Sequence, residues 1–159
     1  MPITINLDKL NKEDLLLSGD LLTDELQLDL GGKHDLIRSA GNLNYEINAS
    51  KADDSILVQG HLKINFSCEC ARCIKLFTHT MDLPSWTTVL SLSDPDTIEV
   101  IGEYVDLTPS IREDILLSLP RHPLCDESCK GLASQRKVVQ EEDKNQSDAW
   151  DKLDQWKQL

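Results

Sequence analysis

Short runs of alternating hydrophobic and polar residues dominate the first ninety positions of the chain. Hydrophobic side chains recur at every second position in residues 3–7, 43–47 and 62–70. This is the period of a β-strand that buries one face. Turn-forming residues separate these runs, among them residues 52–55 (Ala-Asp-Asp-Ser). Short strands joined by small loops predict an antiparallel sheet or an open barrel.

Several further elements are expected in the same region. Leucines alternate with polar residues over 26–30, which predicts another half-buried strand. The Ser-Gly-Asp sequence at 18–20 predicts a turn. Two more strands are expected over 74–81 and 86–92, and Gly60 marks a candidate β-bulge.

One main helix is expected near residues 108–119. Thr108 is the expected N-cap, because its hydroxyl can accept a backbone hydrogen bond, and Pro109 suits the first helical position. Pro120 should end the helix. The expected buried stripe is Ile111, Ile115, Leu116 and Leu119. Sheet and helix together predict an α+β fold.

The chain divides into three segments by composition. Its 159 residues suit one domain of ordinary size. We expect a single α+β domain over 1–133 that contains both cysteine pairs described below. Residues 134–149 are polar and predict a flexible linker. Residues 150–159 place large hydrophobic side chains three apart, which predicts a short amphipathic C-terminal helix that docks on this domain or on a partner.

The charge balance limits the classes of partner. The chain has 28 acidic and 16 basic residues, a net charge of −12. Such a surface repels polyanions, so DNA is not an expected partner. Residues 61–80 and 121–138 are exceptions, each with a net charge of +2. They supply the candidate RNA- or partner-binding residues Arg72, Lys75, Arg121, Lys130, Arg136 and Lys137.

No targeting or membrane segment is expected. The N-terminus lacks a basic region followed by an apolar stretch, and no run approaches the roughly 20 apolar residues of a spanning helix. The mean hydropathy is −0.33. We therefore expect a cytoplasmic protein that does not contact membranes.

Five cysteines are the strongest chemical signal. Two close pairs, Cys70/Cys73 and Cys125/Cys129, could supply four thiolates to a closed structural zinc site. Cys68 continues the alternating apolar face of the preceding strand, so we expect it to be a core residue. A redox role for Cys70 and Cys73 is an alternative. No serine-nucleophile or phosphate-loop motif is present, and we expect no enzymatic activity.

The order of these motifs resembles the YceD family of large ribosomal RNA subunit accumulation proteins. The resemblance rests on the Cys-Ala-Arg-Cys-Ile sequence at 70–74, the Asp-Leu-Thr-Pro sequence at 106–109 and the acidic helix that ends in Leu-Pro at 119–120. It continues through Cys-Lys-Gly-Leu at 129–132 and Asp-Ala-Trp-Asp-Lys-Leu at 148–153.

The chain departs from this family at one place. Many members follow Cys-Lys-Gly-Leu with two more cysteines, and Ala133 and Arg136 stand there instead. In fuller members Cys125 and Cys129 can pair with those thiols rather than with the first pair. The site of this chain is then reduced, rearranged or empty.

The resemblance implies a non-enzymatic bacterial factor that supports accumulation or processing of 23S rRNA. Its partner would be large-subunit rRNA or a pre-ribosomal particle, and a basic ribosomal protein is a second candidate because an acidic surface attracts it. A zinc-stabilised protein–protein adaptor that uses the 150–159 tail is the alternative, with the thiol redox protein as a third hypothesis.

Overall fold

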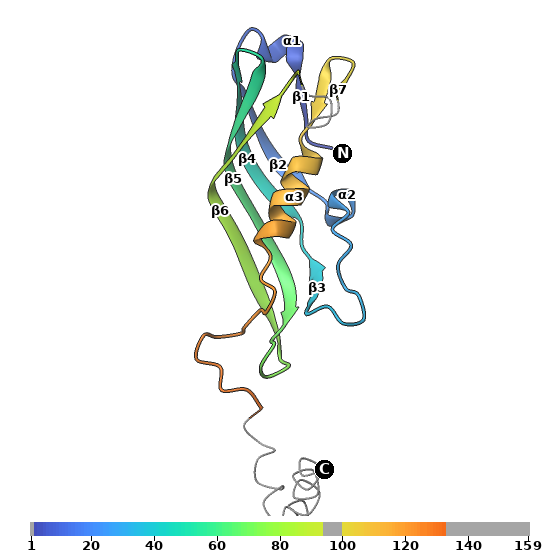
Figure 1. Cartoon of the computed structure of the whole chain (residues 1–159), viewed down its shortest axis with the longest axis vertical. Helices are drawn as coiled ribbons and strands as arrows, with labels where there is room; N and C mark the ends of the chain where they lie inside the picture. Colours follow the sequence, from blue (N-terminus) through green and yellow to red (C-terminus); the bar gives the residue numbers. More distant parts are fainter. Residues whose placement is uncertain (1, 94–99, 133–159) are drawn as a thin grey trace, which may run out of the picture.

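The computed structural model describes residues 2–93 and 100–132, which form two antiparallel sheets and three helices (Figure 1). The larger sheet contains β2 (Leu15–Leu21), β4 (Leu43–Ala52), β5 (Ser55–Glu69), β3 (Ile37–Ala40) and β6 (Leu76–Ser91). The smaller sheet contains β1 (Thr4–Asn6), β8 (Tyr104–Asp106) and β7 (Val100–Ile101). The helices are α1 (Leu7–Leu10), α2 (Thr23–Leu26) and α3 (Thr108–Ser118). The predicted α+β class is confirmed.

The long β5–β6 hairpin gives the molecule its elongated shape (Figure 1). β6 pairs with β5 from Ser55 opposite Ser91 to Glu69 opposite Leu76. The other edge of β5 is shared, because β4 pairs with its first half and β3 with its second. The turn that joins β5 to β6 therefore lies at one end of the molecule.

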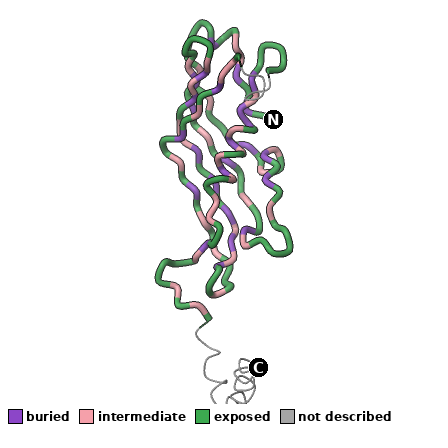
Figure 2. Tube along the Cα trace, in the orientation of Figure 1, coloured by how far each residue is buried: buried purple, intermediate pink, exposed green. Residues whose placement is uncertain are grey.

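The core lies between the inner face of the larger sheet and α3 (Figure 2). Alternate residues of β5 point inward and are buried, as the period of two predicts. Ile111 and Ile115 of α3 are fully buried against them. Each large aliphatic or aromatic side chain buried in this way contributes roughly 1.5–3 kcal/mol. The inward-facing residues of β5 are Ile56, Val58, Leu62, Ile64, Phe66 and Cys68.

Gly60 lies at the expected irregularity. The β5–β6 register shifts between Gly60 and Leu62, as in a β-bulge. A Cβ atom on Gly60 would lie 2.2 Å from the carbonyl oxygen of Glu46 on β4. Close approach of two strands therefore requires glycine here.

Two predictions for the region before β3 are wrong. Residues 18–20 do not form a turn, because β2 continues through them in register with β4. Residues 26–30 do not form a strand. Leu26 ends α2, and Gln27 and Asp29 have positive φ angles of 47° and 50°, which break any regular strand. Leu26 at the end of α2 and Leu28 in the irregular loop after it are buried by tertiary contacts instead.

The two strands expected over 74–81 and 86–92 are one strand, β6, which continues through Pro84. Among the described residues β6 pairs with β5 alone, so it is an edge strand. A proline is tolerated there because an edge strand needs fewer ladder donors. Pro84 also lies opposite the irregularity next to Gly60.

The start of α3 differs from the prediction by one residue. Leu107 is the N-cap and Thr108 is already helical. The hydroxyl of Thr108 accepts a hydrogen bond from the Ile3 N–H at 3.0 Å, which ties α3 to the residue that precedes β1. Asp106 accepts the N–H of Thr108 instead. The helix ends before Pro120 as predicted.

The expected linker over 134–149 and the C-terminal helix over 150–159 lie outside the described residues. In the part of the chain that is described, no helix has the length and apolar character needed to cross a bilayer.

A candidate metal centre

The first cysteine pair lies in the turn between β5 and β6. Cys70 follows the last residue of β5, and its N–H donates to the carbonyl oxygen of Lys75 at 2.9 Å. The N–H of Ile74 donates back to the carbonyl oxygen of Cys70 at 3.0 Å. These two bonds close a tight turn in which Ile74 has a positive φ of 62°. Cys70 and Cys73 consequently project from one short loop.

The second pair lies in the segment that follows α3. Pro123 accepts the N–H of Ala71 through its carbonyl oxygen at 2.9 Å, which lays this segment against the first cysteine turn. The Cys129 N–H donates to the carbonyl oxygen of Asp126 at 3.0 Å, and this bond curls the loop. The two pairs, distant in sequence, therefore meet at one end of the molecule.

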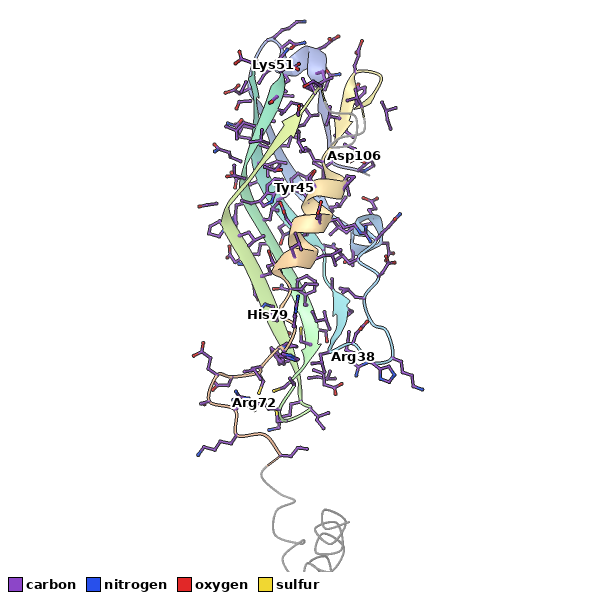
Figure 3. The ribbon with its side chains drawn as sticks, viewed as in Figure 1. Arg38, Tyr45, Lys51, Arg72, His79 and Asp106 are labelled. Atoms are coloured by element: carbon purple, nitrogen blue, oxygen red, sulfur yellow. The ribbon has the colours of Figure 1, made fainter. Side chains whose placement is uncertain are left out.

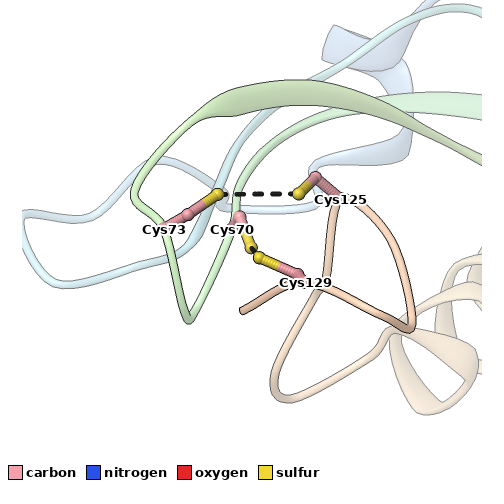
Figure 4. A group of neighbouring side chains, drawn as sticks. All are labelled: Cys70, Cys73, Cys125 and Cys129. Atoms are coloured by element: carbon pink, nitrogen blue, oxygen red, sulfur yellow. Dashed lines mark hydrogen bonds between the residues drawn. The ribbon is translucent and has the colours of Figure 1, made fainter. Parts of the chain in front are cut away.

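The four thiols form a compact cluster (Figure 4). Their Sγ atoms all lie within 4.8 Å of one another. The Sγ atoms of Cys70 and Cys129 are 3.8 Å apart, and those of Cys73 and Cys125 are 3.6 Å apart. Disulfide sulfurs would be about 2.05 Å apart. A tetrahedron with metal–sulfur bonds of about 2.3 Å has edges of about 3.8 Å, so the spacing suits a four-thiolate metal centre.

Cys68 is separate from this cluster, as the alternating pattern predicted. Its side chain is 0 % exposed and belongs to the hydrophobic core. Burial raises the pKa of its thiol, which favours the neutral form. Cys68 is therefore a packing residue.

Backbone donors prepare one sulfur of the cluster to hold negative charge. Hydrogen bonding from the backbone of Cys125, supported by that of Arg72 and Cys73, lowers the pKa of the Cys70 thiol to about 6. The opposite holds for Cys125, whose pKa is raised to about 12 because its thiol hydrogen-bonds to the side chains of Cys73 and Cys70. Four thiolates so close together repel one another, and a bound cation would remove that cost.

The structure gives the six candidate basic residues different surroundings. Arg72 is exposed and reaches across to the second loop, because its Nη1 donates to the carbonyl oxygens of Cys129 at 3.1 Å and Glu127 at 3.3 Å. Lys75, Arg121 and Lys130 are exposed around the cluster, and their side chains have no hydrogen-bond or ion-pair partner in residues 2–93 and 100–132. Arg136 and Lys137 lie outside the described residues.

The sequence reasoning missed one basic residue at this end. Arg38 of β3 lies at the same end of the molecule as Arg72 (Figure 3). Its guanidinium pairs with Glu69 at 2.6 Å, next to the first cysteine turn. Residues 1–60 carry a net charge of −6, so charge counting along the chain gave no signal for this arginine.

Fold and cluster define a small α+β protein with a four-cysteine candidate metal centre. The family model described as "Large ribosomal RNA subunit accumulation protein YceD" matches residues 58–159, and the chain belongs to this family. The match begins in β5 and includes all four clustered cysteines.

Among curated proteins the chain is similar to uncharacterized proteins of Mycobacterium bovis and of two strains of Mycobacterium tuberculosis. Each is 26% identical over 101 residues, which cover 58% of this chain and 49% of the relative. The chain thus spans about half the length of the curated relatives it matches. No solved structure matches the chain.

Proposed function

We propose that the protein is a zinc-stabilised, non-enzymatic factor of the bacterial cytoplasm that supports accumulation or processing of 23S rRNA. The observation that carries this proposal is membership of the YceD family, whose description names large-subunit rRNA accumulation. The candidate metal centre and the exposed basic residues around it are consistent with a binding role.

Zinc is the metal that the ligand chemistry favours. Soft thiolate ligands in a tetrahedral arrangement select zinc or iron–sulfur chemistry, and four protein ligands leave no open position for catalysis. The centre joins the β5–β6 turn to the segment after α3, which shares no sheet with it. Zinc would therefore act as a structural crosslink at this end of the fold.

Charge distribution suggests how the molecule is oriented on its partner. Lys75, Arg121 and Lys130 offer an exposed basic area on a chain with a net charge of −12. This basic area would face large-subunit rRNA or a pre-ribosomal particle, while the acidic remainder limits nonspecific RNA binding. The same acidic surface would attract a basic ribosomal protein.

The first experiment measures the ratio of 23S to 16S rRNA in bacterial cells depleted of the protein. We expect the ratio to fall and the wild-type gene to restore it. Rescue with Cys73→Ser tests the metal centre, and rescue with Cys68→Ala is the matched control, because Cys68 lies outside the cluster. An unchanged ratio on depletion would contradict the proposed function.

The metal itself is tested on the purified chain. Elemental analysis should find one zinc per chain, lost in Cys73→Ser and retained in Cys68→Ala. If the chain contains zinc but its depletion leaves the rRNA ratio unchanged, the protein–protein adaptor is favoured. Deletion of residues 148–159 should then abolish capture of the partner protein. Absence of metal together with reversible oxidation of Cys70 and Cys73 would favour the redox protein.

A further inference from the structure

A cleft of about 530 Å³ lies beside the metal-centre end of the molecule. One wall is the irregular loop that follows α2, and the other is the segment that leaves α3 toward the second cysteine pair. The cleft is lined by leucines and Ile37, by two aspartates, and by His34, Pro120, Arg121 and His122. Its volume is in the range of small-ligand sites.

The lining of the cleft separates into an apolar floor and a polar rim. Leu28 and Ile37 are buried beneath it, and Leu30, Leu36 and Leu116 are half-buried. The rim has exposed His34 on one wall and exposed Arg121 and His122 on the other. Two imidazoles and a guanidinium, all planar groups, therefore surround an apolar surface.

These three rim side chains are available to a ligand. None of them has a hydrogen-bond or ion-pair partner among residues 2–93 and 100–132. The two carboxylates of the cleft are already engaged. Asp29 pairs with Arg112 at 3.1 Å, and Asp35 accepts the N–H of Gly32 at 2.7 Å. A backbone N–H does not neutralise Asp35, so its carboxylate keeps a negative charge. Arg121 is the cationic side chain of the lining and has no ion-pair partner among the described residues.

We propose that this cleft binds an unpaired nucleotide of single-stranded RNA, an assignment that rests on the proposed rRNA function. The base lies on the leucine floor and stacks on the imidazoles of His34 and His122, since histidine and arginine planes are common partners of unstacked RNA bases. Arg121 binds the adjoining phosphate, because its guanidinium can donate two parallel hydrogen bonds to phosphate oxygens. A duplex does not fit this mode, because its bases are stacked inside the helix.

The metal centre keeps one wall of this cleft in place. Arg121 and His122 directly precede Pro123, whose carbonyl oxygen accepts the N–H of Ala71 in the first cysteine turn at 2.9 Å. Cys125 follows two residues later. A zinc ion held by both pairs would fix the wall that carries Arg121 and His122, so removal of zinc should also weaken nucleotide binding.

The test is fluorescence anisotropy of the full-length, zinc-loaded chain with a labelled six-nucleotide single-stranded RNA of mixed sequence. We expect Arg121→Gln to weaken binding at least tenfold and His122→Ala to weaken it severalfold. Lys51→Gln is the matched control, because it removes the same charge at the opposite end of the molecule, and it should change affinity less than twofold (Figure 3). Both rim residues are exposed, so thermal unfolding should show that the variants fold normally.

Competition and mapping decide the class of ligand. Unlabelled single-stranded RNA should displace the probe, whereas an RNA duplex or a glutamate decapeptide should not. Backbone amide NMR shifts should concentrate in residues 28–37 and 116–122. Equal binding by Arg121→Gln, equal competition by duplex or by the acidic peptide, or shifts elsewhere would overturn the assignment. The two proposals can fail separately. If the purified chain binds RNA in this cleft but depletion leaves the cellular rRNA ratio unchanged, the binding site stands and the proposed function is refuted.

Discussion

The guanidinium of Arg72 donates a hydrogen bond to the carbonyl oxygen of Cys129 at 3.1 Å. Arg72 lies between the first two cysteines of the cluster, and Cys129 is the last of the four. The same Nη1 also donates to the carbonyl oxygen of Glu127. One side chain thus braces the two loops that carry the clustered cysteines.

Arg72→Ala should lower zinc affinity about tenfold, because partners that orient metal ligands typically contribute 10- to 100-fold. Arg72→Lys should recover little of the loss, since an ammonium cannot reproduce the geometry of the planar guanidinium. Competition with a chromophoric chelator measures the affinity. Lys75→Ala is the control, because that side chain is exposed and has no partner in the described part of the chain. An equal loss in Lys75→Ala would show a general effect of charge instead.

Ile74→Gly should stabilise the protein. Ile74 has a φ of 62°, where a β-branched residue is strained, and its side chain is 59% exposed, so little burial is lost. The left-handed conformation costs a non-glycine residue about 1–2 kcal/mol. We expect the free energy of unfolding of the zinc-bound chain to rise by about 1 kcal/mol in urea titrations. Ile101→Gly is the control, since Ile101 is equally exposed in β7 without a positive φ, and it should not stabilise.

The sequence predicted those features that depend on local pattern. The period of two over 43–47 and 62–70 identified parts of β4 and β5, because each strand buries one face. The same reasoning failed at residues 26–30, where tertiary contacts bury Leu26 and Leu28 without a strand. Pairing of the four cysteines was only a hypothesis, since no local rule brings together residues separated by the whole of β6 and α3.

Contacts between side chains and distant backbone were beyond the sequence. Arg72 was predicted to bind RNA or a partner from the family resemblance and the local positive charge, and its bond to Cys129, 57 positions away, has no local signature. The hydroxyl of Thr108 was expected to cap α3, but it accepts a hydrogen bond from the N–H of Ile3 instead. Such partners are decided by the packing of segments that are distant in sequence, which the pattern of either segment does not reveal.

Gly60→Ala should destabilise the fold far more than Gly102→Ala. The added Cβ at residue 60 would lie 2.2 Å from a backbone oxygen of β4, and backbone cannot move as a side chain can. We expect a loss of at least about 2 kcal/mol. Gly102 has nothing within 4 Å of the added atom and only a positive φ of 65°, which should cost about 1 kcal/mol. Urea unfolding of both variants measures the difference, and equal losses would mean that β4 is not held this close to β5.

Metal removal and cysteine replacement should separate the roles of two neighbouring cysteines. Cys73→Ser removes one of the four clustered thiols, so we expect loss of tight zinc binding and a lower melting temperature that a chelator cannot lower further. Cys68→Ala should keep zinc and its sensitivity to chelator, while the small cavity left in the core costs about 1 kcal/mol. Elemental analysis and calorimetry with and without chelator measure both effects. Zinc retained by Cys73→Ser, or lost by Cys68→Ala, would contradict the assignment of ligands. The Sγ atom of Cys73 lies within 4.8 Å of the three other clustered sulfurs, and Cys68 is not part of that cluster.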